Sequence, residues 1–181
     1  MMDNSRRPGD GGEAARKARM IRVDQAGEYG ATRIYAGQLA VLKGRPEAAT
    51  IAEMAEKERQ HLERFDRMMV DRKVRPTALS PIWHVAGYAL GAATALAGPK
   101  TAMACTEAVE QVIEEHYAAQ REALGNSDQE LAALIDEARA DEAEHKQRAI
   151  SEGARQAPAH GPVTAAIRAG TRIAIWLSER V

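Results

Sequence analysis

The sequence predicts an all-α protein in which four long helices form two hairpins and two further helices lie outside them. Apolar residues recur with helical periodicity, and no stretch alternates as a strand would. Ala is abundant and aromatic residues make up only 4% of the chain, which favours helices over a β-sandwich. The length of 181 residues suits a single domain.

The first fifteen residues, MMDNSRRPGDGGEAA, predict a disordered N-terminal tail because Gly, Asp and Arg dominate them. They lack the apolar core of a secretory signal. A net charge of −1 gives no general reason to expect a nucleic-acid partner. The single Cys105 excludes an internal disulfide and suits a reducing compartment. We therefore expect one domain over residues 16–181, in the cytoplasm.

The first hairpin joins a helix over 16–43 to a second helix that ends near Arg72. Gly44, Arg45 and Pro46 separate the two helices, and Pro46 suits the first turn of the second. The segment 74–81, VRPTALSP, reads as a linker.

Three glycines interrupt the first helix, and each costs about 0.8–1 kcal/mol relative to Ala in a helix interior. They are Gly27, Gly30 and Gly37, and the carboxylate of Glu28 stands among them. Small residues allow either another helix or a flat ligand to come close. The sequence leaves both readings open.

The segment between Pro76 and Pro99 carries no formal charge and approaches membrane-spanning length. It is nevertheless rich in Ala and Gly and contains His84. We expect a helix over 82–98 that lies on a membrane surface or packs on the bundle, rather than one that crosses the bilayer.

The second hairpin joins helices over 100–124 and 128–153. Gly125 is expected to stop the first of them, and Ser127 or Asp128 to cap the second. A last helix over 162–180 is amphipathic and carries several Arg residues, which suits a membrane surface or a cover for the core.

Two sequence pairs, Glu58/His61 and Glu142/His145, each place a carboxylate and an imidazole on one helix face. Folding the first hairpin about Arg45 puts Glu28, Glu58 and His61 at heights of about 25, 20 and 24 Å, at 1.5 Å per residue. Folding the second about Asn126 puts Glu110, Glu142 and His145 at about 24, 24 and 28 Å. Each hairpin thus brings a lone Glu level with a Glu-x-x-His.

The two hairpins repeat one another. Glu110 follows Glu28 by 82 positions, and the second Glu-x-x-His follows the first by 84. Four Glu and two His are the ligand set of di-iron and di-manganese carboxylate proteins with a ferritin-like four-helix bundle, and the long connection 73–99 supplies the single crossover of that fold. Carboxylates and imidazole suit iron, although the ligand types do not exclude manganese.

Several segments resemble the demethoxyubiquinone hydroxylase family, the di-iron monooxygenases of ubiquinone biosynthesis. They are MIRVDQAGEYGATRIYAGQ, EKERQHLERF, MACTEAVEQVIEEHY, DEAEHK and AGTRIAIWLSERV, and the similarity covers roughly residues 19–181. The family's ligands fall on Glu28, Glu58, His61, Glu110, Glu142 and His145. Its His-Tyr pair falls on His116 and Tyr117, which the resemblance offers as a relay for protons or electrons. Gln25 stands where many relatives have His, and no ligand is lost.

The resemblance implies that two iron ions and O2 hydroxylate the ring of a demethoxyubiquinol. Electrons would come from NADH or from the quinol itself, and without strands there is no Rossmann site for NADH. The polyprenyl tail of the substrate implies peripheral association with the cytoplasmic side of the cell (inner) membrane. The family further implies a lipid-binding accessory protein, and a homo-oligomer is left open.

Two other functions stay open from the residues alone. A ferritin-like iron-oxidising or storage protein, or another di-metal oxidase, would use the same ligands, although the uncharged segment suits a hydrated shell poorly. A membrane scaffold without enzymatic activity would bind no metal. A rubrerythrin-like peroxidase would need four Cys for its rubredoxin module, and the chain has one.

Overall fold

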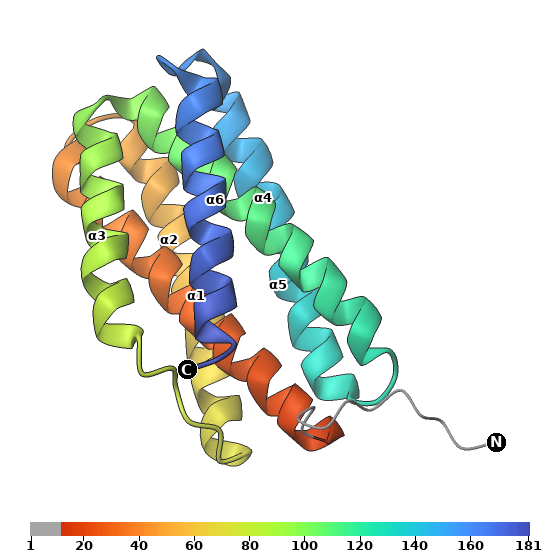
Figure 1. The fold of residues 1–181 in the computed structure, drawn as a ribbon. Helices are drawn as coiled ribbons and strands as arrows, with labels where there is room; N and C mark the ends of the chain where they lie inside the picture. Colours follow the sequence, from red (N-terminus) through yellow and green to blue (C-terminus); the bar gives the residue numbers. More distant parts are fainter. Residues whose placement is uncertain (1–11) are drawn as a thin grey trace.

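The computed structural model describes residues 12–181, and within that range the chain is helical and contains no β-strand (Figure 1). The prediction of an all-α fold is confirmed. The elements are α1 (Glu13–Leu42), α2 (Glu47–Asp71), α3 (Ser80–Leu96), α4 (Pro99–Leu124), α5 (Gln129–Ser151), the 3-10 turn η1 (Ala154–Gln156) and α6 (His160–Ser178).

The helix boundaries lie within three residues of those expected from the sequence. Asp128 caps α5, because its side chain accepts the backbone N–H of Leu131 at 3.1 Å. Gly125 ends α4 with a positive φ of 54°. Pro46 precedes α2 instead of lying in its first turn. The prediction of a disordered tail falls largely on residues 1–11, outside the described range, whereas residues 13–15 already belong to α1.

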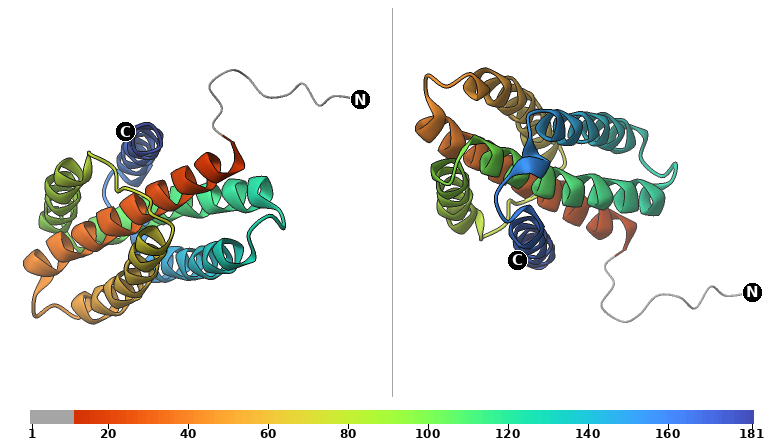
Figure 2. Two further views of the ribbon diagram at one scale, coloured as in Figure 1. Left: turned by 90° about the horizontal axis from the view of Figure 1, so that it is seen from below. Right: turned by 90° about the horizontal axis from the view of Figure 1, so that it is seen from above.

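Helices α1 and α2 form one antiparallel hairpin, and α4 and α5 form the other. The two hairpins pack into a four-helix bundle, and the crossover from α2 to α4 carries α3 (Figures 1 and 2). Outside the bundle, α3 packs along α1 and α6 packs along α4. The two outer helices therefore cover the same side of the α1/α4 pair.

Helices α1 and α3 approach until their backbones touch, and glycine makes this possible. A Cβ added to Gly37 would lie 2.2 Å from the carbonyl oxygen of Tyr88, and one added to Gly91 would lie 1.9 Å from that of Ile34. Of the two readings of the α1 glycines, close helix packing is therefore correct for Gly37.

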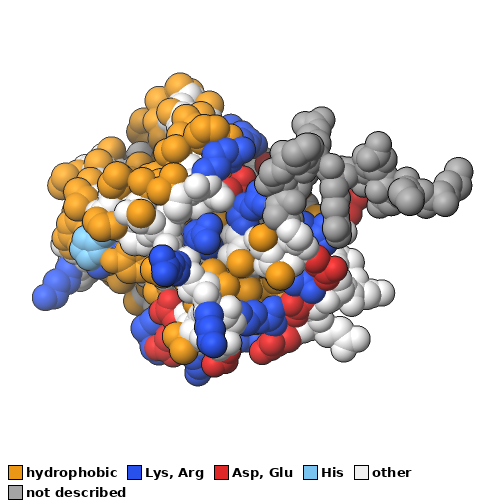
Figure 3. Space-filling view, turned by 60° about the horizontal axis from the view of Figure 1, so that its bottom comes forward, with side chains coloured by type: hydrophobic (Ala, Val, Ile, Leu, Met, Phe, Trp, Pro, Cys, Tyr) orange, Lys and Arg blue, Asp and Glu red, His pale blue; other side chains and the backbone are white. Residues whose placement is uncertain are grey.

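The outer helices expose apolar side chains. Figure 3 shows hydrophobic side chains gathered on the side where α3 and α6 lie, while charged side chains dominate the opposite side. The large exposed members on these helices are Ile82, Val85, Tyr88, Leu96, Ile173 and Trp176. Among residues 12–181, no helix has both the length and the hydropathy to cross a bilayer.

Candidate metal centre and its cavity

Six carboxylate and imidazole side chains lie together inside the bundle, each at most 4% exposed. They form two overlapping groups, within which one possible ligand atom per residue lies within 4.8 Å of every other. Glu58 and Glu142 belong to both groups, so they lie between the two possible metal positions. The first group is Glu28, Glu58, His61 and Glu142, and the second is Glu58, Glu110, Glu142 and His145.

Each of the six side chains has at least one buried oxygen or nitrogen without a hydrogen-bond partner, and Glu58 and Glu142 have two each. Buried polar atoms in folded proteins are nearly always paired, so this many orphaned atoms facing one another need a partner. Nδ1 of His145 lies 2.8 Å from Oε1 of Glu58 without hydrogen-bond alignment. Oxygen and imidazole donors of this kind fit iron or manganese.

The negatively charged carboxylates of the cluster repel one another when no cation is present. Burial raises the pKa of Glu58 well above its usual range, and the nearby charges of Glu28 and Glu110 raise it further. Burial raises the pKa of Glu142 in the same direction, with Glu58 and Glu110 adding to the effect. Divalent cations would remove both penalties, so the electrostatics of the donor set also fit a metal pair.

Two buried tyrosines hold the lone carboxylates across the bundle. Tyr35 on α1 donates a 2.7 Å hydrogen bond to Oε1 of Glu110 on α4. Tyr117 on α4 donates one to Oε1 of Glu28 on α1. Tyr117 was expected near the centre from the family resemblance. Tyr35 was missed, although its position seven residues after Glu28 matches that of Tyr117 after Glu110.

The two histidines have different surroundings. Nε2 of His61 lies 3.0 Å from Oδ2 of Asp141, and Nζ of Lys57 lies 3.5 Å from Oδ1 of the same carboxylate. Among residues 12–181, the carboxylates within 4.0 Å of a His145 ring nitrogen are Glu58 and Glu142 alone. Burial lowers the pKa of His145. Burial also acts to lower the pKa of His61, but Glu28 and Asp141 outweigh it and the pKa is raised.

His116, the other residue of the expected relay, lies near the carboxylate of Asp24, which the sequence reasoning missed. Its Nε2 lies 3.5 Å from Oδ1 of Asp24 and 2.8 Å from the amide nitrogen of Gln120, which itself donates to Asp24 at 2.7 Å. Burial raises the pKa of Asp24 to about 6, against the opposing effect of His116. Asp24 lies one helical turn before Glu28 on α1, and the imidazole of His116 at the other end of the trio is partly exposed.

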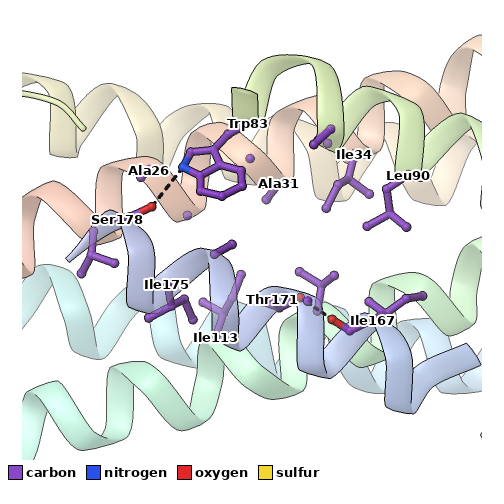
Figure 4. A pocket seen from close by; sticks show the side chains of 18 of the residues that line it. Ala26, Ala31, Ile34, Trp83, Leu90, Ile113, Ile167, Thr171, Ile175 and Ser178 are labelled. Atoms are coloured by element: carbon purple, nitrogen blue, oxygen red, sulfur yellow. Dashed lines mark hydrogen bonds between the residues drawn. The ribbon is translucent and has the colours of Figure 1, made fainter. Parts of the chain in front are cut away.

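An apolar cavity of about 470 Å³ lies between α1, α3, α4 and α6 (Figure 4). Gly27 and Gly30 line it, and a Cβ at either position would meet nothing within 4 Å. For these two glycines the reading as space for a ligand is therefore the one that fits. Isoleucine, leucine and alanine side chains supply most of the rest of the wall.

One hydrogen bond joins the two outer helices beside this cavity. Nε1 of Trp83 on α3 donates to Oγ of Ser178 on α6 at 3.0 Å (Figure 4). It is the one hydrogen bond between α3 and α6 in the described part of the chain. Between this contact and the bundle, the two helices leave the cavity free.

Residues 15–178 match the protein family described as ubiquinone biosynthesis protein COQ7. The chain is 53% identical over 178 residues to the 3-demethoxyubiquinol 3-hydroxylase of Rhodospirillum rubrum, covering 97% of this chain and 84% of that protein. It is 48% identical over 167 residues to the human NADPH-dependent 3-demethoxyubiquinone 3-hydroxylase, mitochondrial, with coverages of 90% and 77%. It is 40% identical over 186 residues to the 5-demethoxyubiquinone hydroxylase, mitochondrial, of Saccharomyces cerevisiae, with coverages of 93% and 80%.

Proposed function

The chain belongs to the COQ7 family of ubiquinone biosynthesis, and on that premise we propose that it is a monooxygenase that hydroxylates the ring of demethoxyubiquinol with O2. The observation that carries the proposal is the buried set of six side chains, found in a chain that resembles these hydroxylases over nearly its whole length. A storage function is not favoured, because the similar proteins are named as hydroxylases.

Two iron ions would be held by Glu28, Glu58, His61, Glu110, Glu142 and His145. The orphaned ligand atoms and the mutual repulsion of the carboxylates support this assignment. When bound, an iron pair supplies the redox chemistry that activation of O2 requires. The protein itself keeps the cluster buried, which excludes bulk water from the reacting atoms.

The remaining polar residues orient ligands and carry protons. Tyr35 and Tyr117 fix the carboxylates of Glu110 and Glu28 by hydrogen bonds. We propose that His116 takes up protons at its partly exposed imidazole and passes them to Oδ1 of Asp24, one turn from Glu28. The 3.5 Å separation of these atoms supports this route, and Gln120, whose amide nitrogen contacts both, holds the two side chains beside one another when the imidazole is neutral.

The quinone ring and the start of its polyprenyl tail would occupy the apolar cavity. Its wall of glycine and aliphatic side chains suits a flat, uncharged ring and a hydrocarbon chain. Exposed apolar residues on α3 and α6 would rest on the membrane that supplies the substrate. We propose peripheral association with the cytoplasmic side of the inner membrane, with NADH or the quinol as electron source and a lipid-binding accessory protein as partner.

Metal content and product analysis of one variant pair test the function. Purified protein should contain about two iron ions per chain by elemental analysis. Glu110→Gln should contain far less metal and lose hydroxylation of a short-tailed demethoxyubiquinol. Glu114→Gln, one turn further along α4 and ion-paired with Lys146, is the matched control and should retain both. The product should carry one oxygen atom from ¹⁸O2, measured by mass spectrometry.

Other outcomes separate the alternatives. A metal-loaded protein that oxidises iron without hydroxylating the quinol would be a ferroxidase, and light scattering would show whether it assembles into a shell. A protein that binds neither iron nor manganese would rule out the di-metal site. Failure to float with liposomes that contain the quinone would contradict membrane association but leave the chemistry intact.

A further inference from the structure

The internal repeat lets each half of the centre be compared with the other. Tyr117 follows Tyr35 by 82 positions, the spacing that separates Glu110 from Glu28. The two tyrosine hydroxyls bond the two lone carboxylates reciprocally. The environment of these carboxylates is thus nearly two-fold symmetric.

The symmetry fails at the residue that precedes each Glu-x-x-His. Asp141 holds this place on α5, and the equivalent place on α2, 84 positions earlier, is Lys57. Among residues 12–181, Asp141 is the one carboxylate outside the cluster that lies within 4.0 Å of either imidazole. It binds Nε2 of His61 on the opposite hairpin, and Lys57 reaches the other oxygen of the same carboxylate.

This contact fixes one imidazole and leaves the other without an equivalent support. Because Nε2–H of His61 donates to Asp141, the lone pair of Nδ1 faces the cluster, where Oε2 of Glu28 lies 3.7 Å away. A carboxylate behind a ligating histidine sets its tautomer and orientation and makes it a better donor. In the described residues, the carboxylates within 4.0 Å of a His145 ring nitrogen are those of Glu58 and Glu142, both members of the cluster.

A second break in the repeat adds charge on the same side. Gln38 and Gln120 are equivalent by the 82-residue spacing, and each bonds a residue on the opposite helix. Gln120 bonds the carboxylate of Asp24, whereas Gln38 bonds the hydroxyl of Thr106. The additional carboxylate again lies beside Glu28, in the half that contains His61.

We propose that the two metal positions are unequal, with the His61/Glu28 position binding its ion first and Asp141 acting as the positioning residue responsible. This inference rests on the metal pair of the proposed function and adds an order of loading to it. The His145/Glu110 position fills second, because in the described residues no carboxylate outside the cluster lies within 4.0 Å of its imidazole to set the tautomer beforehand.

Titration of the metal-free full-length protein with Co²⁺ alone tests the order. Calorimetry and visible absorption should resolve two binding events whose dissociation constants differ by about tenfold or more. His61→Gln should abolish the tighter event and His145→Gln the weaker one, which assigns the events to positions. Asp141→Asn should weaken the tighter event by about 10- to 100-fold and leave the weaker one within about threefold.

Controls keep the result specific. Asp136→Asn removes a surface carboxylate from the same helix, where it pairs with Arg121, and should bind Co²⁺ as the wild type does. Asp141→Ser gives an independent test if the Asn variant fails to fold, and circular dichroism checks each fold. Two equal events in the wild type, or an equal loss at both positions in Asp141→Asn, would overturn the inference but not the metal centre. Absence of Co²⁺ binding would overturn both.

Discussion

Tyr35 on α1 donates a 2.7 Å hydrogen bond to the carboxylate of Glu110, while Glu28, seven residues before it, accepts one from Tyr117. On each helix the tyrosine lies about two turns after the glutamate. Each tyrosine donates a hydrogen bond to the glutamate of the other helix. Each phenol fills space between helices and supplies one hydrogen-bond donor to a buried oxygen. The carboxylates of Glu28 and Glu110 are therefore oriented by the protein alone.

Tyr35→Phe should destabilise the metal-free protein by about 1–3 kcal/mol, because it leaves a buried carboxylate oxygen without its donor. Urea denaturation followed by circular dichroism gives the free energy of unfolding. Tyr117→Phe should lose a similar amount. Tyr88→Phe removes a hydroxyl from a partly exposed ring and should have no comparable effect. Equal stability of Tyr35→Phe and the wild type would show that the hydroxyl does not support Glu110.

Asp24 predicts a pH dependence with a definite sign. Its pKa is raised from 3.8 to about 6 in the fold, so the unfolded chain releases this proton first as pH rises. Below about pH 4 this carboxyl does not affect the free energy of unfolding. As pH rises from about 4 to about 6 it lowers the free energy of unfolding, by roughly 3 kcal/mol in total at 1.36 kcal/mol per pKa unit. Asp24→Asn should therefore gain stability over the wild type as pH rises from 4 to 7. Metal-free samples should be unfolded with urea at each pH, and a constant difference would contradict the prediction.

The glycines of α1 predict opposite effects for the same substitution. Gly30→Ala should stabilise the protein by about 0.5–1 kcal/mol, because the added Cβ meets nothing and Ala favours a helix. Gly37→Ala should destabilise it by about 1–3 kcal/mol, because the Cβ would overlap the carbonyl of Tyr88. Thermal unfolding measures both effects. A third variant, Gly30→Leu, should fold but bind a quinone analogue weakly, since its side chain fills the cavity.

The Trp83–Ser178 hydrogen bond predicts that its loss loosens the outer helices locally. Trp83→Phe and Ser178→Ala each remove the hydrogen bond between α3 and α6. Each should increase amide hydrogen exchange near the end of α6, while exchange in α4 stays unchanged. A double-mutant cycle should give a coupling energy of about 0.5–1.5 kcal/mol. Additive effects would show that the contact does not hold the helices together.

Much of the fold and the six clustered residues could be predicted because they depend on spacing along helices. The distance of each Glu and His from a hairpin turn sets its height in the bundle, and the turns carry clear Gly and Pro signals. Asp141 and Asp24 could not be selected in this way, since they are two of 26 acidic residues and only packing shows which carboxylate meets an imidazole. Tyr35 resembled an ordinary core residue.

The cavity could not be predicted from the sequence, because its shape also depends on how helices pack. It exists because α3 lies against the backbone of α1 from Gly30 to Gly37 and α6 follows α4, so that the two outer helices leave a space beside Gly27 and Gly30. This arrangement depends on angles between helices, which the periodicity of a single helix does not fix. The same periodicity gave no way to separate packing glycines from cavity glycines.

Helix α1 contributes to two parts of the molecule. Glu28 and Tyr35 face the carboxylate cluster. Gly27, Gly30 and Gly37 face the outer helices and the cavity. Inserting or deleting one residue between Asp24 and Gln38 would rotate everything beyond it by about 100° and misalign both faces together. Related sequences are therefore expected to differ in this stretch by substitutions, without insertions or deletions. The connection between α2 and α3 is not helical, so a change in its length does not rotate one helix face against another.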